Sequence, residues 1–306
     1  MKHLIDINDL SYDEIENIFS LAAKLKKELK EGKTHHLLKG RTLGMIFSKS
    51  STRTRVSFEV GMYQLGGSAI FLSSEDIQLG RGETIHDTAK VLSSYVDGIM
   101  IRTFRQSDVL DLARYGTVPV INGLTDLMHP CQILSDLFTV YEKKGKLEGL
   151  KLAYIGDGNN VANSLLQGCA KTGMDIAVAT PAGYGCDEAI IDQAKLAAQK
   201  SGSSILLTDD PEEAIKDADV VYTDTWVSMG QENEKELRLK VFMPYQVNSR
   251  LFSMAKKDAM FLHCLPAYRG YEVTGDIIDG PNSCVFEEAE NRLHVQKAIM
   301  VTLMGS

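Results

Sequence analysis

Two series of short apolar runs, each alternating with helical stretches, constrain the fold of this 306-residue chain more than any other feature. Uninterrupted apolar runs of this length are typical of parallel strands that helices cover on both faces. The first series of expected strands is 43–47, 69–72, 98–101 and 118–121. The second series is 152–155, 176–179, 205–207, 220–223 and 260–263. The pattern predicts an α/β protein with two doubly wound domains, each a mainly parallel sheet flanked by helices.

The polar segment 142–149 (EKKGKLEG) separates the two series and marks the expected domain boundary. The length suits two domains of roughly 150 residues each. We expect a first domain over residues 1–145 and a second over 146–286, with the active site in the cleft between them. The last helix, about 287–306, cannot be placed from the apolar pattern, and we expect it to pack back on the first domain.

The N-terminal part of the chain carries the signals of one amphipathic helix. Ser11 and Glu14 have the spacing of a capping box, and apolar residues then recur with the helical period from Ile15 to Leu29. Gly32 is expected to end this helix.

Charge and cysteine content exclude several classes of protein. The net charge of −8 argues against a nucleic-acid-binding surface. The five cysteines are odd in number and form no CxxC pair, which favours a reducing compartment over a disulfide framework or a zinc site. The N-terminus has no apolar core of a secretory signal, and no apolar run is long enough to span a bilayer. We therefore expect a cytoplasmic protein with no membrane partner.

A run of hydroxyl and guanidinium groups lies where the strand 43–47 passes into a helix. Ser51, Thr52, Arg53 and Thr54 follow this strand directly. Free N–H groups and the positive end of the helix dipole meet at such a turn, and arginine forks match phosphate oxygens. The turn is not a Walker A loop. The alternative, a Ser/Thr-capped helix with solvated basic residues, explains one such residue but not the whole run.

Two further elements are expected at the same sheet edge. Arg102 follows the strand 98–101, and His129 lies just before Pro130, which would stand in the first turn of the next helix. A lone histidine is usually structural. Because His129 is expected to lie beside the bound phosphate dianion, it becomes a candidate site residue.

The second domain offers an acceptor site instead of a dinucleotide site. The turn 156–161 (GDGNNV) follows a strand, but Val161 replaces the third glycine and the next strand ends without an acid for a ribose. Asn159 and Asn160 stand at a helix N-terminus, where they can cap the helix or bind a ligand. Asp224 follows the strand 220–223 and is a natural partner for a ligand ammonium group, although it could equally be a turn former.

Together, the motifs Ser51–Arg55, Arg102 and His129–Gln132 resemble the carbamoyl-phosphate signatures of the aspartate/ornithine carbamoyltransferase family. The resemblance covers essentially the whole chain in order. It implies a carbamoyl-phosphate site made of Ser51, Thr52, Arg53, Thr54, Gln78, Arg102, His129, Pro130, Cys131, Gln132, Cys264, Leu265 and Arg292. In this site Ser51 to Thr54 and Arg102 hold the phosphate, while His129 and Gln132 contact the carbamoyl end. Gln78 is implied to reach the site of a neighbouring subunit.

The resemblance extends to His263-Cys264-Leu265-Pro266 and to Arg292 in the last helix. It implies that Cys264 lies between both substrates and that Arg292 contacts the carbamoyl oxygen. The ornithine-binding residues implied by the family are Asn160, Asp224, Ser228 and Met229. An aspartate acceptor would require cations here, and putrescine-specific relatives carry a more aromatic run in place of 228–230.

The resemblance implies transfer of a carbamoyl group to the δ-amine of L-ornithine, giving L-citrulline and phosphate in arginine metabolism. The implied catalytic residues are Arg53, Arg102, His129, Asp224, Cys264 and Arg292. No metal or organic cofactor is expected, because phosphate is already a good leaving group. The expected assembly is a trimer or a multiple of trimers. Two alternatives remain: transfer to another amine such as putrescine, and a catalytically silent ligand-binding relative.

Overall fold

A computed structural model describes residues 1–74, 77, 82–228 and 230–305 of the chain. The chain divides into two compact units. The first unit contains residues 1–135 and 290–306, and the second contains residues 136–289. Both unit boundaries fall inside helices, α5 (Pro130–Lys144) and α12 (Val285–Met304).

The first unit is built on a parallel sheet with the strand order β2-β1-β3-β4. Its strands are β1 (Thr42–Phe47), β2 (Ser68–Ser73), β3 (Gly98–Arg102) and β4 (Val120–Leu124). The first expected series is therefore confirmed, except that β4 begins two residues later than predicted. Pro119 has no N–H to donate to a ladder, which explains the late start. Leu4 pairs with Ile121 and covers the outer edge of β4.

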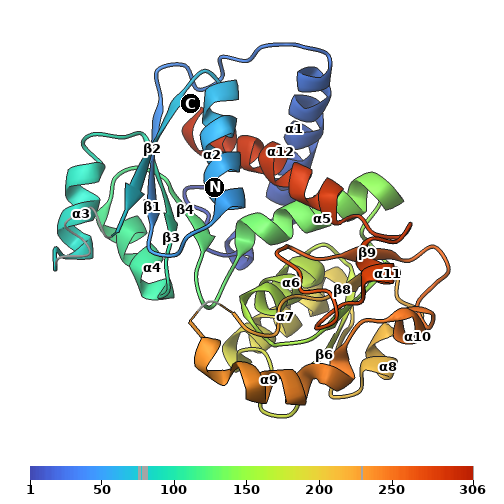
Figure 1. Cartoon of the computed structure of the whole chain (residues 1–306). Helices are drawn as coiled ribbons and strands as arrows, with labels where there is room; N and C mark the ends of the chain where they lie inside the picture. Colours follow the sequence, from blue (N-terminus) through green and yellow to red (C-terminus); the bar gives the residue numbers. More distant parts are fainter. Residues whose placement is uncertain (75–76, 78–81, 229, 306) are drawn as a thin grey trace. The chain divides into compact units, whose positions relative to one another are not determined.

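Helices cover both faces of this sheet (Figure 1). The helices confined to the first unit are η1 (Ile7–Asp9), α1 (Tyr12–Lys30), α2 (Thr52–Gln64), α3 (Ile85–Leu92) and α4 (Gln106–Tyr115). Residues of α3 and α4 pack with the strands into one apolar core. The opposite face is so closely covered that a Cβ added at Gly98 would lie 2.8 Å from the Met304 sulfur of α12. The predicted capping box of α1 is present, with Ser11 and Glu14 as its two partners.

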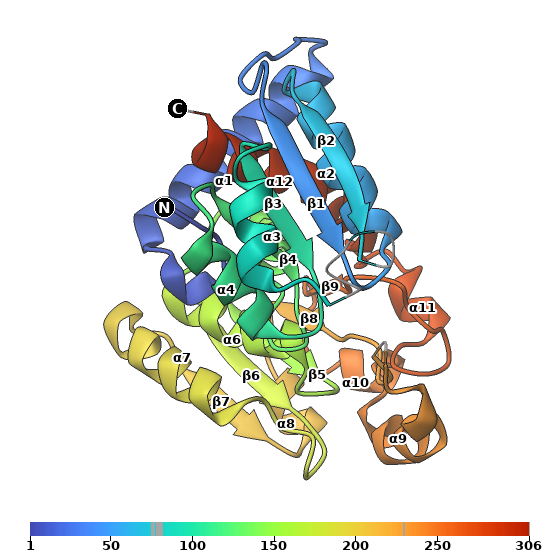
Figure 2. The ribbon, with the colours of Figure 1, turned by 90° about the vertical axis from the view of Figure 1, so that its left-hand side faces the viewer.

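The second unit contains a parallel sheet of order β7-β6-β5-β8-β9 (Figure 2). Its strands are β5 (Lys151–Ile155), β6 (Asp175–Ala179), β7 (Ile205–Thr208), β8 (Val220–Tyr222) and β9 (Met260–Leu262), as the second series predicts. Its helices are α6 (Asn160–Lys171), α7 (Glu188–Ser201), α8 (Pro211–Ile215), η3 (Glu232–Glu234), α9 (Lys235–Phe242), η4 (Met243–Tyr245), α10 (Ser249–Phe252) and α11 (Gly275–Ile278). The two doubly wound α/β units agree with the predicted fold class.

Strand order locates the ligand-binding edge of each sheet. In the first unit the chain moves from β1 outward to β2 and then to β3 on the other side of β1. In the second unit it moves from β5 to β6 and β7, and then to β8 on the other side of β5. Open α/β sheets bind ligands beyond the carboxyl ends of the strands at such a switch point. The residues after β1, β3, β5 and β8 are therefore the first candidates for function.

No helix in the described part of the chain is long and apolar enough to cross a membrane.

Candidate active site

The turn after β1 forms the N-terminus of α2, as the sequence predicts. Ser51 is the N-cap, and its hydroxyl oxygen accepts a hydrogen bond from the backbone N–H of Thr54 at 3.2 Å. Thr54 is buried, whereas Thr52 is exposed and Arg53 is half-buried. The other N–H groups of this first turn and the positive end of the helix dipole meet here. This arrangement suits a bound anion.

The charges of three guanidinium groups act on His129, which lies just before the N-terminus of α5. Burial, followed by the charges of Arg292, Arg102 and Arg53, holds the pKa of His129 well below its usual value. The imidazole is therefore neutral near pH 7 and can act as a hydrogen-bond donor without adding charge. The predicted cations Arg53, Arg102 and Arg292 thus all act on one neutral donor of the first unit.

Arg292 joins two of the predicted phosphate-site segments. Its Nη1 donates to the side-chain oxygen of Gln132 at 2.5 Å, and its Nη2 donates to Thr54 Oγ1 at 3.1 Å. All three residues are almost fully buried. Because Arg292 lies in α12, the C-terminal helix supplies the bridge between α2 and α5.

Pro130 and Cys131 lie in the first turn of α5, as predicted for Pro130. The Cys131 thiol donates its only proton to the backbone oxygen of Asn122 at 3.4 Å, and burial raises its pKa to about 12. A contribution of Cys131 to phosphate binding would therefore have to come from its main chain. The predicted Gln78 lies outside the described residues.

Lys49 is a cation of this region that the sequence reasoning did not single out. Its ammonium group is buried, pairs with Asp126 and lies 4.5 Å from the centre of the Phe104 ring. The signal available in the sequence was its position in the turn between β1 and α2, two residues before Ser51.

In the second unit, the turns after β5 and β8 meet at the carboxylate of Asp224. The amide nitrogen of Asn159 donates to Oδ2 at 2.8 Å, and the backbone N–H of Thr225 donates to Oδ1 at 2.8 Å. The thiol of Cys264, which follows β9, donates to Oδ1 at 3.1 Å. Asp224 is buried. The carboxylate is thus fixed by donors from three strand ends.

Cys264 acts as a neutral thiol in this geometry. Burial, followed by the negative charge of Asp224, raises the pKa of Cys264 well above its usual value. The group is therefore a proton donor to Asp224 and not a thiolate nucleophile. The next residue, Leu265, has a left-handed backbone with φ 56°, which residues with a side chain rarely adopt.

Asn159 makes a hydrogen bond to Asp224. The Asn159 side chain also caps α6 by accepting from the N–H groups of Val161 and Ala162. Asn160 is the first residue of α6 and lies beside this contact in the chain. The sequence placed both asparagines at a helix N-terminus, but only the tertiary structure shows that Asn159 contacts the carboxylate.

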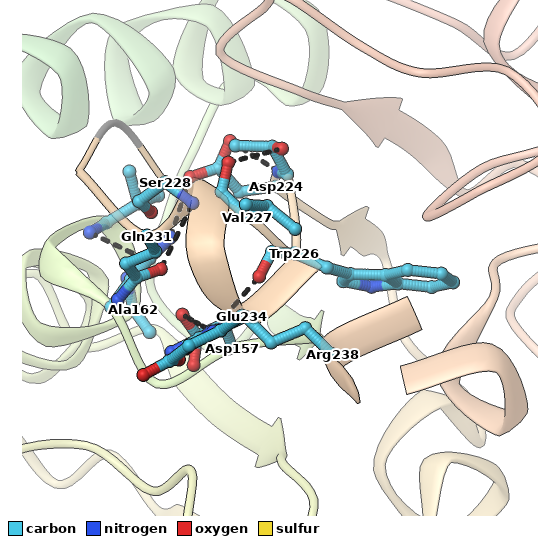
Figure 3. Close-up of polar contacts among 12 residues, drawn as sticks. Asp157, Ala162, Asp224, Trp226, Val227, Ser228, Gln231, Glu234 and Arg238 are labelled. Atoms are coloured by element: carbon cyan, nitrogen blue, oxygen red, sulfur yellow. Dashed lines mark hydrogen bonds and ion pairs between the residues drawn. The ribbon is translucent and has the colours of Figure 1, made fainter. Parts of the chain in front are cut away.

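A buried ion pair holds the loop that follows Asp224 (Figure 3). Arg238 Nη1 lies 2.9 Å from Asp157 Oδ2 and donates to the backbone oxygen of Trp226 at 3.0 Å. Burial raises the pKa of Asp157 to about 6, although the charge of Arg238 opposes this shift. The sequence reasoning missed both partners, which lie 81 residues apart.

The predicted residue Ser228 lies at a closed turn of the same loop. Its backbone N–H donates to the side-chain oxygen of Gln231 at 3.1 Å, and its backbone oxygen accepts from the N–H of Gln231 at 3.0 Å (Figure 3). The predicted Met229 lies outside the described residues.

One group of potential metal ligands occurs among the described residues. Donor atoms of Asp224, His263 and Cys264 all lie within 4.8 Å of one another. However, both ring nitrogens of His263 already have partners: Nδ1 accepts from the N–H of Leu265 at 2.9 Å, and Nε2 lies 3.2 Å from a carboxylate oxygen of Glu272. Because a cation would have to break one of these contacts, we assign no metal to this group.

Comparison with known proteins covers both units. Residues 2–142 match the carbamoyl-P binding domain of aspartate/ornithine carbamoyltransferases, and residues 148–303 match the Asp/Orn binding domain. The ornithine carbamoyltransferase of Caldicellulosiruptor saccharolyticus is 61% identical over 98% of this chain and 98% of its own length. That of Bacillus subtilis is 60% identical over 99% of this chain and 94% of its own length.

A solved structure supports the same relationship. The ornithine carbamoyltransferase from Pyrococcus furiosus superimposes with a TM-score of 0.97 at 56% identity, covering 100% of this chain and 97% of the other. Sequence similarity, domain content and fold therefore agree over the full length. The chain belongs to the aspartate/ornithine carbamoyltransferase family.

Proposed function

We propose that this chain is an ornithine carbamoyltransferase, which transfers the carbamoyl group of carbamoyl phosphate to the δ-amino group of L-ornithine. The products are L-citrulline and phosphate. The acceptor assignment rests on the buried carboxylate of Asp224, which Asn159, Thr225 and Cys264 hold in one orientation. A fixed carboxylate suits an amine acceptor, whereas a dicarboxylic acceptor such as aspartate would need cations.

Most of the contacts with carbamoyl phosphate come from the first unit in this proposal. Arg53 and Arg102 neutralise the phosphate, with Ser51, Thr52 and Thr54 as further donors. His129, Gln132 and Arg292 contact the carbamoyl end, and the remaining contacts come from Gln78, Pro130, Cys131, Cys264 and Leu265. The charges of three guanidinium groups that keep His129 neutral support this assignment.

The second unit binds L-ornithine. Asp224 pairs with the amine that is carbamoylated, while Asn160, Ser228 and Met229 contact the α-amino-acid end. The domain boundaries proposed from the sequence are 1–145 together with the last helix for carbamoyl phosphate, and 146–286 for ornithine.

Carbamoyl transfer forms a C–N bond and breaks the C–O bond to phosphate. The amine is protonated in water, with a lysine-like pKa of about 10.4, and must release one proton to solvent before it attacks. Asp224 and Cys264 orient the amine as it does so. Charge then develops on the carbamoyl oxygen, where His129, Thr54 and the Arg53 and Arg292 guanidinium groups act as an oxyanion hole. The attacking nitrogen loses a second proton as the C–N bond forms, and the departing phosphate accepts this proton, so no metal or organic cofactor enters the step.

We also propose a homotrimer or a multiple of trimers, with Gln78 completing a neighbouring site. Apolar side chains exposed on α2 and on the edge strand β2 support an assembly; they are Val56, Val60, Tyr63, Ile70 and Phe71. Mixed oligomers of a Gln78 variant and an Arg53 variant should recover activity that neither parent has. Hybrids confirmed by mass but without activity would contradict a shared site.

The decisive experiment is a transfer assay with radiolabelled carbamoyl phosphate and a panel of amines. We expect kcat/KM for ornithine to exceed that for putrescine by well over about tenfold, because putrescine lacks the α-amino-acid end and leaves its binding groups unpaired. If putrescine proved equal or better, the acceptor assignment would be wrong. If carbamoyl phosphate bound without transfer to any amine, the chain would be a silent relative.

A further inference from the structure

Two carboxyl groups lie side by side in the interior of the second unit. Asp136 belongs to α5 and Glu288 to α12, and at most 1% of either residue is exposed. The Tyr222 hydroxyl on β8 lies 3.1 Å from Asp136 Oδ2 and 3.2 Å from Glu288 Oε1. One hydroxyl oxygen thus lies within hydrogen-bond distance of both acids, which places the two carboxyl groups next to each other. Neither acid has a role in the mechanism above.

These two acids cannot both be ionised at neutral pH. Two like charges this close together in a buried site repel strongly, and one proton held between the two carboxyl groups removes this repulsion. The single Tyr222 proton can serve only one acceptor at a time. Burial, followed by the charge and hydrogen bond of Asp136, raises the pKa of Glu288 well above its usual value. The pair therefore carries one proton and one negative charge.

The pair is connected directly to the segment 263–265. Glu288 Oε2 accepts a hydrogen bond from the backbone N–H of His263 at 2.9 Å. The His263 ring in turn accepts from the Leu265 N–H at 2.9 Å and contacts Glu272 through its other nitrogen. Cys264, which donates to Asp224, lies between these two anchored residues. The left-handed backbone of Leu265 is sparsely populated and persists only where its surroundings hold it.

We propose that Asp136 and Glu288 form a shared-proton pair that positions the segment from His263 to Leu265 for reaction. The pair touches no reacting atom and acts through the His263 N–H. This role deepens the proposed carbamoyl transfer and rests on it. The shared proton limits the negative charge near Asp224, whose carboxylate a second ionised acid would repel. The titratable groups whose pKa values respond to the pair are Tyr222 on β8, Cys264 after β9, Cys169 on α6 and Cys284 before α12.

Infrared spectroscopy tests the proton without using activity. At about pH 8 ordinary carboxyl groups are ionised and have no carbonyl band of a protonated acid. Such a band at this pH would therefore show that a proton is held by the Asp136–Glu288 pair. We expect this band in the wild type and its loss in both Glu288→Gln and Asp136→Asn, since either amide supplies the shared hydrogen permanently. Glu287→Gln is the matched control, because that exposed neighbour pairs with Lys143 at the surface. A wild type without the band, or a band that persists in both variants, would overturn the shared proton.

Kinetics tests the positioning role. Glu288→Ala removes the acceptor of the His263 N–H, and we expect kcat/KM for ornithine to fall at least about tenfold. Glu288→Gln should recover most of this loss, because an amide oxygen can accept from His263 while its NH2 donates to Asp136. Carbamoyl phosphate affinity, measured by calorimetry, should also fall in Glu288→Ala, because the positioned segment carries the proposed contacts of Cys264 and Leu265, and Glu288→Gln should restore it. An equal loss of kcat/KM in the Ala and Gln variants would contradict the positioning role.

The two measurements separate failure of this inference from failure of the proposed function. A wild type that transfers no carbamoyl group to ornithine yet shows the infrared band would refute the function and retain the shared proton. An active wild type without the band would retain the function and refute the pair. If Glu288→Ala does not fold, Asp136→Asn and Glu288→Gln still decide the presence of the shared proton.

Discussion

The same sheet edge carries opposite charge in the two units of this protein. Beyond the carboxyl ends of the strands, the first unit presents Arg53 and Arg102 and adds Arg292 from the last helix. The corresponding edge of the second unit presents the buried carboxylates of Asp157 and Asp224. Both units are doubly wound parallel sheets with a switch in strand order. Fold alone therefore selects the place of a ligand, and the residues after each strand select its charge.

The two regions also differ in how their charged groups are held. Arg292 binds Gln132 and Thr54 across 160 and 238 residues of sequence, so the cationic edge depends on the C-terminal helix. Asp224 is held by the adjacent Thr225 N–H and by side chains 65 and 40 residues away. If each region serves a different substrate, substitutions in one should leave the ligand of the other almost unaffected.

The largest effect is expected from Asp224→Asn. The amide keeps the shape but loses the negative charge that orients the amine, and we expect turnover with ornithine to fall about 100-fold. Carbamoyl phosphate binding should remain nearly intact. Steady-state kinetics and one calorimetric titration measure both quantities, with Asp209→Asn at an exposed position as the control. A comparable loss of carbamoyl phosphate affinity would contradict the proposal that the two regions bind different substrates.

Arg102→Ala is the reciprocal test in the cationic region. Loss of a forked, charge-assisted contact should weaken carbamoyl phosphate binding by at least ~1.5 kcal/mol, roughly tenfold, and Arg53→Ala should behave alike. Calorimetry gives the affinity directly. Arg105→Ala, whose side chain is exposed, should bind like the wild type. Unchanged affinity in both the Arg53 and Arg102 variants would refute the phosphate assignment.

A smaller effect is expected from Arg238→Lys. Lysine keeps the charge but cannot contact Asp157 and the Trp226 carbonyl with one planar fork, so the loop after β8 should loosen. We expect KM for ornithine to rise about fivefold, or ~1 kcal/mol, with carbamoyl phosphate affinity unchanged. The exposed Arg250→Lys is the control. An unchanged KM would show that this ion pair does not support the acceptor site.

The smallest effect should be a pH-dependent change in the fluorescence of Trp226, the only tryptophan in the chain. The pKa of Asp157 is raised to about 6, so its carboxylate is charged above this pH and becomes neutral below it. Acidification should weaken its hold on Arg238 and alter the surroundings of Trp226, whereas Glu234 and the Trp226 carbonyl retain the guanidinium. A titration with a midpoint near 6 in the wild type should disappear in Asp157→Asn. A transition of the same size in that variant would assign it to another group.

Most of the architecture could be predicted because its signals are local. Alternating apolar runs identified the strands of both sheets, and the spacing of Ser11 and Glu14 identified the start of α1. The positions of Arg102 and Asp224 directly after apolar runs placed them at the ligand-binding edge, since parallel strands end together. The apolar pattern alone placed the start of β4 two residues too early, because it took no account of Pro119, which cannot donate to the ladder.

The sequence by itself determined that there are two α/β domains, the order of their strands along the chain, and the residue types at each strand end. Only the tertiary structure decided which of these side chains meet. It showed that Asn159 binds Asp224, that Arg238 holds Asp157, and that Asp136 lies against Glu288. Secondary structure follows from periodicities of two to four residues, which any short window of sequence contains. A contact between side chains on separate elements depends on how those elements pack, and no local pattern encodes that geometry.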